Sequence, residues 1–340
     1  MFDFILNFFN PKHLLVQPLS DFQKSMVKNY NKKARNGTLA YEVLPCLCKQ
    51  QVFKTLLKYG RLGEWSPVVI CQKCGLIQCN PRLTEEEYER FYSSDEYREL
   101  YGGETFLKEQ KNKFLENNHI FDDLASVIKK RGLNTILEVG CGGGWNLIPF
   151  KKSGYSVTGF DYSEKSIQQG KPYGLNIRQG SIKSLSEVND KYDVIILNHV
   201  IEHSTNFFND MNLIRQKMNK NGIIYIGVPN IDNCHLSQFH NAHTLYFTPL
   251  TFLHYMNLCG LKEIDFGSAQ KIHMYGIFKI MQDSSNQKND LGNEYTRMIK
   301  KIRFEKLKFV IAVPLKILGI KHFVATILKR INILKPPTQL

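Results

Sequence analysis

The chain has 340 residues, enough for two domains or for one large domain with appendages. Hydrophobic residues make up 43% of it and charged residues 22%, which excludes wholesale disorder. The formal net charge is +14, and residues 296–340 alone carry +10 of it. Because the excess charge lies in a C-terminal tail, we expect no nucleic-acid partner for the body and one anionic contact at the end of the chain.

The N-terminal residues 1–10 are apolar, but they lack a basic region and a small-residue cleavage site, so we expect no secretory signal. No run reaches the roughly 18 apolar residues of a membrane span. Eight cysteines are too few for a disulfide scaffold, and their clustering favours reduced thiols in the cytoplasm. We expect an N-terminal extension over residues 1–44, which includes a basic stretch, followed by a cysteine module over residues 45–82.

The cysteine module holds five of the eight cysteines. Cys46-x-Cys48 and, after a gap, Cys71-x-x-Cys74-Gly75 have the form of a four-thiolate zinc site, since soft thiolates suit tetrahedral Zn²⁺. The first half is irregular because Cys-x-x-Cys is the usual spacing, and Cys79 is an additional candidate. The pattern predicts structural zinc, with a metal-free loop as the alternative.

Residues 83–132 are predicted to form a helical connector. Thr84, followed by Glu85, Glu86 and Glu87, is typical of a capping box at the start of a helix. Phe106–Lys130 has helical apolar spacing, and its basic last turn is followed by Gly132, which predicts the end of the helix there.

Residues 133–282 alternate short apolar runs with helical patterns. Such alternation predicts a doubly wound α/β fold, with helices on both faces of a mostly parallel sheet. The last two runs are close enough together to form an antiparallel hairpin at the sheet edge. The expected strands are Thr135–Val139, Ser156–Phe160, Asn176–Gln179, Tyr192–Leu197, Gly222–Val228, Lys262–Asp265 and Tyr275–Met281.

A glycine-rich turn follows the first of these strands. The strand ends in Glu138, and Gly140, Gly142 and Gly144 follow at alternate positions before a helical segment. Glycines allow the backbone to turn sharply and to approach a ligand at a helix N-terminus. A purely structural turn is the alternative. A nicotinamide dinucleotide site is disfavoured because the separated third glycine of that motif is missing.

The order of these motifs resembles that of the class I S-adenosylmethionine-dependent methyltransferases over about residues 133–282. The resemblance implies S-adenosyl-L-methionine as cofactor and Asp161, at the end of the second strand, as the ribose-binding acid. Ser181 stands where family members often carry an acid for the adenine. The implied cofactor-binding residues are Glu138, Gly140, Cys141, Gly142, Gly144, Asp161, Tyr162, Ser181, Ile182, Asn198 and His199.

Two histidines are candidates for removing a proton from the acceptor. His203 follows the fourth strand, and His243 lies in a loop similar to the His-rich loop of sugar methyltransferases, where a Tyr-Phe pair follows. His243 and Tyr246 keep their places, whereas Ala242 replaces the glutamate of that loop, so O-methylation becomes more plausible than carbon methylation. The predicted catalytic residues are His203, His243 and Tyr246. Loop-shaping roles are the alternative, and a metal pair of His199 with His203 lacks a third ligand.

Residues 45–103 resemble the zinc-binding module that precedes the methyltransferase core in sugar and polysaccharide methyltransferases. The resemblance implies that the module covers the active site and that Tyr92 and Tyr97 approach the substrate, with core packing as the alternative. The expected function is therefore methyl transfer to a sugar hydroxyl or amine, on a nucleotide- or lipid-linked sugar in surface polysaccharide assembly. A quinone or lipid methyltransferase at the membrane and a non-catalytic scaffold are the alternatives.

The C-terminal segment is predicted to be a linker and a basic amphipathic tail over residues 283–340. Between residues 317 and 334 the apolar residues Ile320, Phe323, Val324, Ile327, Leu328, Ile331 and Leu334 fall on one helical stripe. Such a helix is typical of membrane-surface binding, so residues 309–335 predict peripheral contact with the inner face of the membrane. Packing on the body of the protein or on a second subunit is the alternative.

Overall fold

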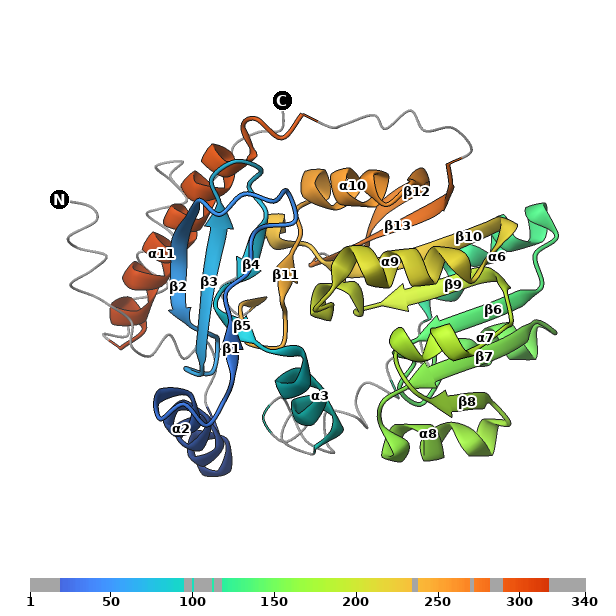
Figure 1. Cartoon of the computed structure of the whole chain (residues 1–340), viewed down its shortest axis with the longest axis horizontal. Helices are drawn as coiled ribbons and strands as arrows, with labels where there is room; N and C mark the ends of the chain where they lie inside the picture. The colour runs from blue at the N-terminus through green and yellow to red at the C-terminus, as the bar shows by residue number, and fades with distance from the viewer. Residues whose placement is uncertain are drawn as a thin grey trace.

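The computed structural model describes residues 19–94, 100, 112, 118–233, 238–269, 272–281 and 290–317, and side chains only as far as residue 307 in the last range. A seven-stranded sheet lies on one side of the molecule. A four-stranded sheet, flanked by the long helix α11, lies on the other (Figure 1). A two-stranded ladder of β1 (Tyr41–Glu42) and β5 (Arg82–Leu83) is also present.

The seven-stranded sheet has the order β12-β13-β10-β9-β6-β7-β8. The strands from β10 to β8 are parallel, whereas β13 is antiparallel to both β10 and β12. The predicted edge hairpin is therefore confirmed. All seven predicted strands are present, several of them longer than expected. Their bounds are β6 Thr135–Val139, β7 Ser156–Asp161, β8 Asn176–Gln179, β9 Tyr192–Asn198, β10 Met218–Pro229, β12 Leu261–Ala269 and β13 His273–Ile280.

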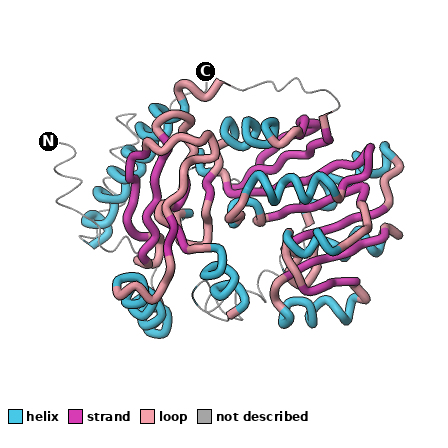
Figure 2. Tube along the Cα trace, in the orientation of Figure 1, coloured by secondary structure: helices cyan, strands magenta, loops and turns pink. Residues whose placement is uncertain are grey.

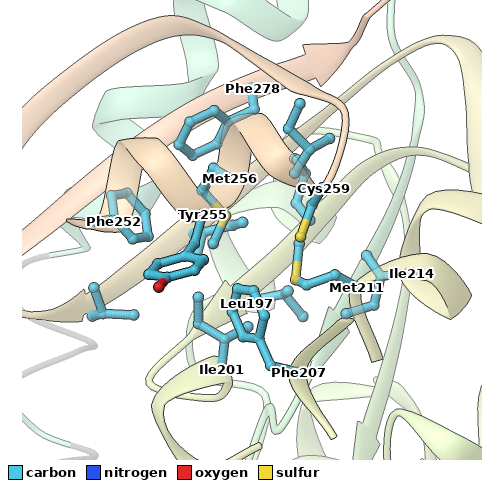
Figure 3. Packing of buried hydrophobic residues seen from close by; sticks show 14 of the residues in the cluster. Leu197, Ile201, Phe207, Met211, Ile214, Phe252, Tyr255, Met256, Cys259 and Phe278 are labelled. Atoms are coloured by element: carbon cyan, nitrogen blue, oxygen red, sulfur yellow. The ribbon is translucent and has the colours of Figure 1, made fainter. Parts of the chain in front are cut away.

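Helices cover both faces of this sheet, as the alternating pattern predicts (Figure 2). On one face α9 (Phe207–Gln216) and α10 (Pro249–Leu258) pack together, and Figure 3 shows Tyr255 of α10 near Leu197 of β9 and Phe207 of α9. The other face is covered by α6 (His119–Arg131) and α7 (Leu147–Lys152). The strands of this sheet are also connected by α8 (Glu164–Gly170) and by short 3₁₀ turns. These turns are Lys171–Tyr173, Lys183–Glu187, Ile201–His203 and Ile231–Asn233.

Two predicted helix ends are present. The Thr84 side chain accepts a hydrogen bond from the Glu87 backbone N–H and caps α3 (Glu85–Ser93). Gly132 ends α6 in the left-handed conformation at φ 63°, where a side chain would be strained. Most of the expected helical segment before residue 118 lies outside the described residues.

The four-stranded sheet is built from the cysteine module and from one strand of the large domain. Its order is β11-β4-β3-β2, so β11 (Leu245–Tyr246) pairs with β4 (Ile77–Cys79) across a long sequence separation. The other two strands are β3 (Trp65–Cys71) and β2 (Phe53–Tyr59), and α2 (Asp21–Arg35) precedes them. The histidine-rich loop before β11 is thereby attached to the cysteine module.

The beginning of the predicted C-terminal tail is a helix that packs on the body. In α11 (Glu294–Ile317), Met298, Ile299 and Ile302 are buried against the small sheet, beside Val68 and Ile70. The membrane contact predicted for residues 309–335 stays a prediction, because the buried side chains of α11 precede that range. No helix within the described ranges is long and apolar enough to cross a bilayer. The amphipathic stripe between residues 320 and 334 lies outside the described residues.

Candidate active site

A cavity of about 700 Å³ opens at the carboxyl ends of the parallel strands. Val139, Asp161, Asn198 and Pro229 line it at the ends of β6, β7, β9 and β10. Open α/β sheets bind ligands at this edge, where the loops leave a crevice. The wall opposite the strands comes from α3 and from the loop that contains His240 and His243.

The glycine turn forms one end of the cavity. Gly140 and Gly142 have φ values of 69° and 56°, and the Gly142 N–H donates to Asp161 Oδ2 at 2.7 Å. A Cβ on Gly142 would meet no atom within 4 Å, because the residue faces open space. Gly144 differs from its predicted role: it does not line the cavity, and a Cβ there would strike Leu175 and Ile177. Glycine at this position therefore leaves room for Leu175 and Ile177 to pack inside the domain.

Glu138 is a buried carboxyl group at the start of this turn. It is 1% exposed and accepts a hydrogen bond from Asn146 Nδ2 at 2.6 Å through Oε1. Its Oε2 atom has no hydrogen-bond partner within the described part of the chain. Burial raises the pKa of Glu138 to about 8; the Asn146 hydrogen bond opposes this rise and the charge of Asp161 adds to it. The orphaned oxygen borders the cavity and suits a positively charged or hydrogen-bond-donating ligand.

The other predicted cofactor residues also line the cavity: Cys141, Asp161, Tyr162, Ser181, Ile182, Asn198 and His199. The Asp161 carboxylate is already oriented, since Oδ1 accepts from the Ser163 N–H at 2.8 Å and Oδ2 from the Gly142 N–H. Two backbone donors thus fix this carboxylate at the strand end, as a ribose-binding acid requires.

His203 has a defined tautomer at the far end of the cavity. Its Nδ1 lies 2.7 Å from the carbonyl oxygen of Ala242, which can only accept, so Nδ1 carries the proton and Nε2 has a free lone pair. The Tyr92 hydroxyl donates to the same carbonyl at 2.9 Å and lies 2.8 Å from His203 Nδ1. Burial lowers the pKa of His203 below its usual range, against the charge of Glu202. The neutral ring can accept a proton or bind a metal ion through Nε2.

His243 and His240 lie beside His203. The ring centroids of His203 and His243 are 4.8 Å apart and those of His243 and His240 are 3.8 Å apart. All three histidines line the cavity. Burial lowers the pKa of both loop histidines well below their usual range, which keeps them neutral. This arrangement brings together two of the three predicted catalytic residues, although they are distant in sequence.

Tyr246, the third predicted catalytic residue, lies outside the cavity lining. Its hydroxyl donates to the His240 carbonyl oxygen at 2.8 Å and accepts from the His240 N–H at 3.1 Å. The side chain is 3% exposed. Because both hydrogen bonds close the loop on itself, Tyr246 shapes the histidine loop and does not face a ligand.

His199 and His203, considered above as a metal pair, do not share a helix face. His199 is in the left-handed conformation at φ 57°, and the following helical element is only the 3₁₀ turn Ile201–His203. His199 Nδ1 lies 3.0 Å from Glu202 Oε1, and its ring packs on His273 at 4.5 Å. Burial alone would raise the pKa of Glu202, but the His199 hydrogen bond and the charge of His203 bring it below its usual value.

The four predicted zinc ligands lie together. The Sγ atoms of Cys46, Cys48, Cys71 and Cys74 are all within 4.8 Å of one another, and the closest pairs are 3.4 and 3.6 Å apart. Tetrahedral zinc with bonds of about 2.3 Å places sulfurs about 3.8 Å apart. No described cysteine forms a disulfide. Cys79, the additional candidate, lies elsewhere and contacts Ser66 and Tyr246.

Several cavity residues were not predicted from the sequence. Arg61 reaches the lining from the turn between β2 and β3, and His273 from the start of β13. His240, in the lining, and Glu202, outside it, are neighbours of predicted residues in the sequence or the fold but were not predicted as site residues. Tyr92 lines the cavity as the resemblance implied, whereas Tyr97 lies outside the described residues.

Comparison with known proteins agrees with this geometry. Residues 107–264 match a family model described as a methyltransferase domain. This segment of the chain is thus similar to methyltransferase domains. A ubiquinone biosynthesis O-methyltransferase of Rickettsia canadensis is 35% identical over 28% of this chain and 42% of its own length. One from Agrobacterium fabrum is 26% identical over 49% of this chain and 72% of its own length. The chain thus spans less than half of the length of the first of these relatives.

Solved methyltransferases resemble the domain at low identity. A SAM-dependent methyltransferase from Archaeoglobus fulgidus is 19% identical with a TM-score of 0.42, over 52% of this chain and 99% of that one. The 1,6-didemethyltoxoflavin-N1-methyltransferase of Burkholderia thailandensis is 14% identical with a TM-score of 0.46, over 64% and 96%.

The residues of the methyltransferase domain fit S-adenosylmethionine. The orphaned Glu138 Oε2 offers an acceptor to a cationic ligand, and the space at Gly142 is open because no side chain occupies it. Asp161 offers a preoriented carboxylate for hydroxyl groups. When bound, the cofactor supplies a methyl group activated by its sulfonium, and the protein supplies orientation.

Replacing Glu138 with glutamine should stabilise the ligand-free protein at neutral pH. The folded-state pKa of Glu138 is about 8 and its unfolded value is near 4.5, so the folded state holds a proton that the unfolded state releases between these pH values. The Glu138 contribution to stability is thus present below pH 4.5 and lost as the pH rises to 8, by up to about 1.4 kcal/mol per pH unit. Urea unfolding of Glu138→Gln should show a flatter pH dependence. An unchanged slope between pH 5 and pH 8 would contradict the assigned pKa.

Proposed function

We propose that this protein transfers a methyl group from S-adenosylmethionine to a hydroxyl group of a sugar, nucleotide- or lipid-linked, in surface polysaccharide assembly. The observation that supports this most is that one cavity is lined both by the glycine turn with Asp161 and by His203 with His243. The two ends provide what the reaction requires, a cofactor site and a group that handles the acceptor proton. An amine acceptor on the sugar remains within the same proposal.

Chain segments far apart in sequence meet at the acceptor end. Tyr92 lies on α3, and its ring stacks between Tyr88 at 6.1 Å and Tyr162 of the cofactor end at 6.5 Å. Lys183, after β8, forms ion pairs of 3.0 and 2.8 Å with Glu85 and Glu89 of α3. These contacts hold α3 over the cavity, where it restricts the access of water.

The experiment is an acceptor screen with purified protein and S-adenosylmethionine, in which S-adenosylhomocysteine formation is measured. Nucleotide sugars and lipid-linked sugars form one group of acceptors, and polyprenyl catechols form the other. We expect turnover with members of the first group. Turnover with the second group alone would favour the quinone candidate, which the names of the relatives support. Binding of S-adenosylmethionine without turnover of either group would favour the scaffold.

We also propose that Cys46, Cys48, Cys71 and Cys74 bind one structural zinc ion. The compact sulfur cluster supports this, as does the hydroxyl of Tyr255 on α10, which donates to Cys74 Sγ at 3.2 Å. With four protein ligands no position is open, so zinc here would hold the cysteine module and not act in catalysis.

Replacing Cys71 with serine should remove zinc and lower the free energy of unfolding by several kcal/mol, because metal affinity contributes to folding. Metal analysis and urea unfolding measure the two effects. Cys79→Ser is the matched control, since Cys79 is equally buried but outside the cluster. Equal zinc content in both variants would contradict the assignment.

A further inference from the structure

We propose that Glu202, His203 and His243 bind a catalytic divalent transition-metal ion that holds the acceptor hydroxyl. Each residue offers one ligand atom, and the three atoms lie within 4.8 Å of one another. Two histidines and one carboxylate suit ions such as Zn²⁺, Mn²⁺ and Co²⁺. The catalytic role rests on the methyl transfer proposed above, whereas binding of the ion does not.

In His203 and in Glu202, one polar atom of the side chain is held by a hydrogen bond, and the other is left without one within the described residues. His203 donates through Nδ1 to Ala242, which leaves Nε2 for an ion. Glu202 Oε1 is held by His199 Nδ1, and Glu202 Oε2 has no hydrogen-bond partner among the residues that the structure describes. Metal-binding histidines and carboxylates are oriented in this way by neighbours that hydrogen-bond to their second polar atom.

Burial makes the unpartnered atoms costly. Glu202 is 1% exposed and His243 is 8% exposed, and His243 Nδ1 also lacks a hydrogen-bond partner within the described ranges. An unsatisfied buried polar atom costs about 1–3 kcal/mol. A cation bound by one atom each of Glu202, His203 and His243 would offset this cost.

The position of the three residues beside the cavity points to a catalytic role for the metal ion. His203 and His243 line the cavity, whereas Glu202 lies behind them and does not. Three protein ligands leave a coordination position open on the cavity side, as in catalytic metal sites. A hydroxyl oxygen bound there would lose its proton to water more readily. The oxygen would then form the new O–C bond to the methyl group as the C–S bond breaks, and the electron pair of that bond would stay on sulfur in S-adenosylhomocysteine.

The test measures Mn²⁺ binding by the loss of the free-ion EPR signal, because Mn²⁺ prefers nitrogen and oxygen ligands to the thiolates of the cysteine module. We expect one Mn²⁺ per chain, with affinity at least about 100-fold weaker in Glu202→Gln and in His243→Gln. Glu263→Gln, on the exposed side of β12, should bind Mn²⁺ as the wild type does. Absence of Mn²⁺ binding, or unchanged binding in the two ligand variants, would overturn the site.

Calorimetric titration with S-adenosylmethionine shows whether a variant that loses Mn²⁺ binding is still folded. Comparison with turnover then distinguishes loss of the metal site from failure of the proposed function. Both ligand variants should retain cofactor affinity within about threefold, which shows that they are folded. If a variant loses this affinity, the His203→Gln variant replaces it in the Mn²⁺ test. Mn²⁺ binding without any methyl transfer would leave the metal site standing and would count against the acceptor class. Full turnover in protein with the site emptied by chelation would overturn its catalytic role.

Discussion

Replacing Gly142 with valine should weaken S-adenosylmethionine binding by at least about 100-fold, which corresponds to about 2.7 kcal/mol. Gly142 lines the cavity, and the new side chain would project into space that is open in the protein and that we assign to the cofactor. Calorimetric titration measures the affinity. A retained affinity would contradict the assignment of the glycine turn to the cofactor.

Gly154 provides a matched control for this variant. Like Gly142, it has a positive φ, 90° against 56°, and no atom within 4 Å of an added Cβ, but it does not line the cavity. The left-handed conformation costs a residue with a side chain about 1–2 kcal/mol. Gly154→Val should therefore lose stability by this amount and keep its cofactor affinity. Comparison of the two variants separates backbone strain from obstruction of the site.

Replacing His203 with alanine should reduce methyl transfer by about 10²–10⁴-fold while S-adenosylmethionine affinity stays within about threefold. His203 lines the cavity, and we proposed above that its Nε2 accepts the acceptor proton or holds a metal ion that binds the acceptor. The rate of S-adenosylhomocysteine formation in a single turnover, with an acceptor identified by the screen, measures this reduction.

His254→Ala is the control for this prediction, because His254 lies on α10 and does not line the cavity. It should keep turnover within a factor of about three. If His203→Ala retained more than about a tenth of the wild-type rate with unchanged cofactor affinity, His203 would be a residue that only shapes the loop.

The seven strands of the large sheet could be predicted because each is a short apolar run bounded by turn residues, a signal contained within a few neighbours. The glycine turn was equally local, and its positive φ values at Gly140 and Gly142 confirm why glycine stands there. The four cysteines could be grouped by spacing alone, and the structure brings their sulfurs together.

The sequence could not predict what depends on contacts between distant segments. Tyr246 was expected at the acceptor, but pairing of β11 with β4 turns its hydroxyl onto His240. The start of the C-terminal segment was expected to belong to a linker and basic tail, but the small sheet has an apolar face that α11 covers. The apolar face of a helix has the same periodicity whether it binds a membrane or packs on the protein core. Only the surface that covers this face distinguishes the two cases.

The sequence by itself therefore determined the strand order along the chain, the cofactor turn and the thiolate cluster, since each depends on spacing within a short segment. The tertiary structure decided the chemistry of the acceptor end. Glu202 and His243 are 41 residues apart, and they meet because α3 and β11 hold the histidine loop against the end of β9. Which ring nitrogen of His203 is free depends on the Ala242 carbonyl, a contact that no local pattern encodes.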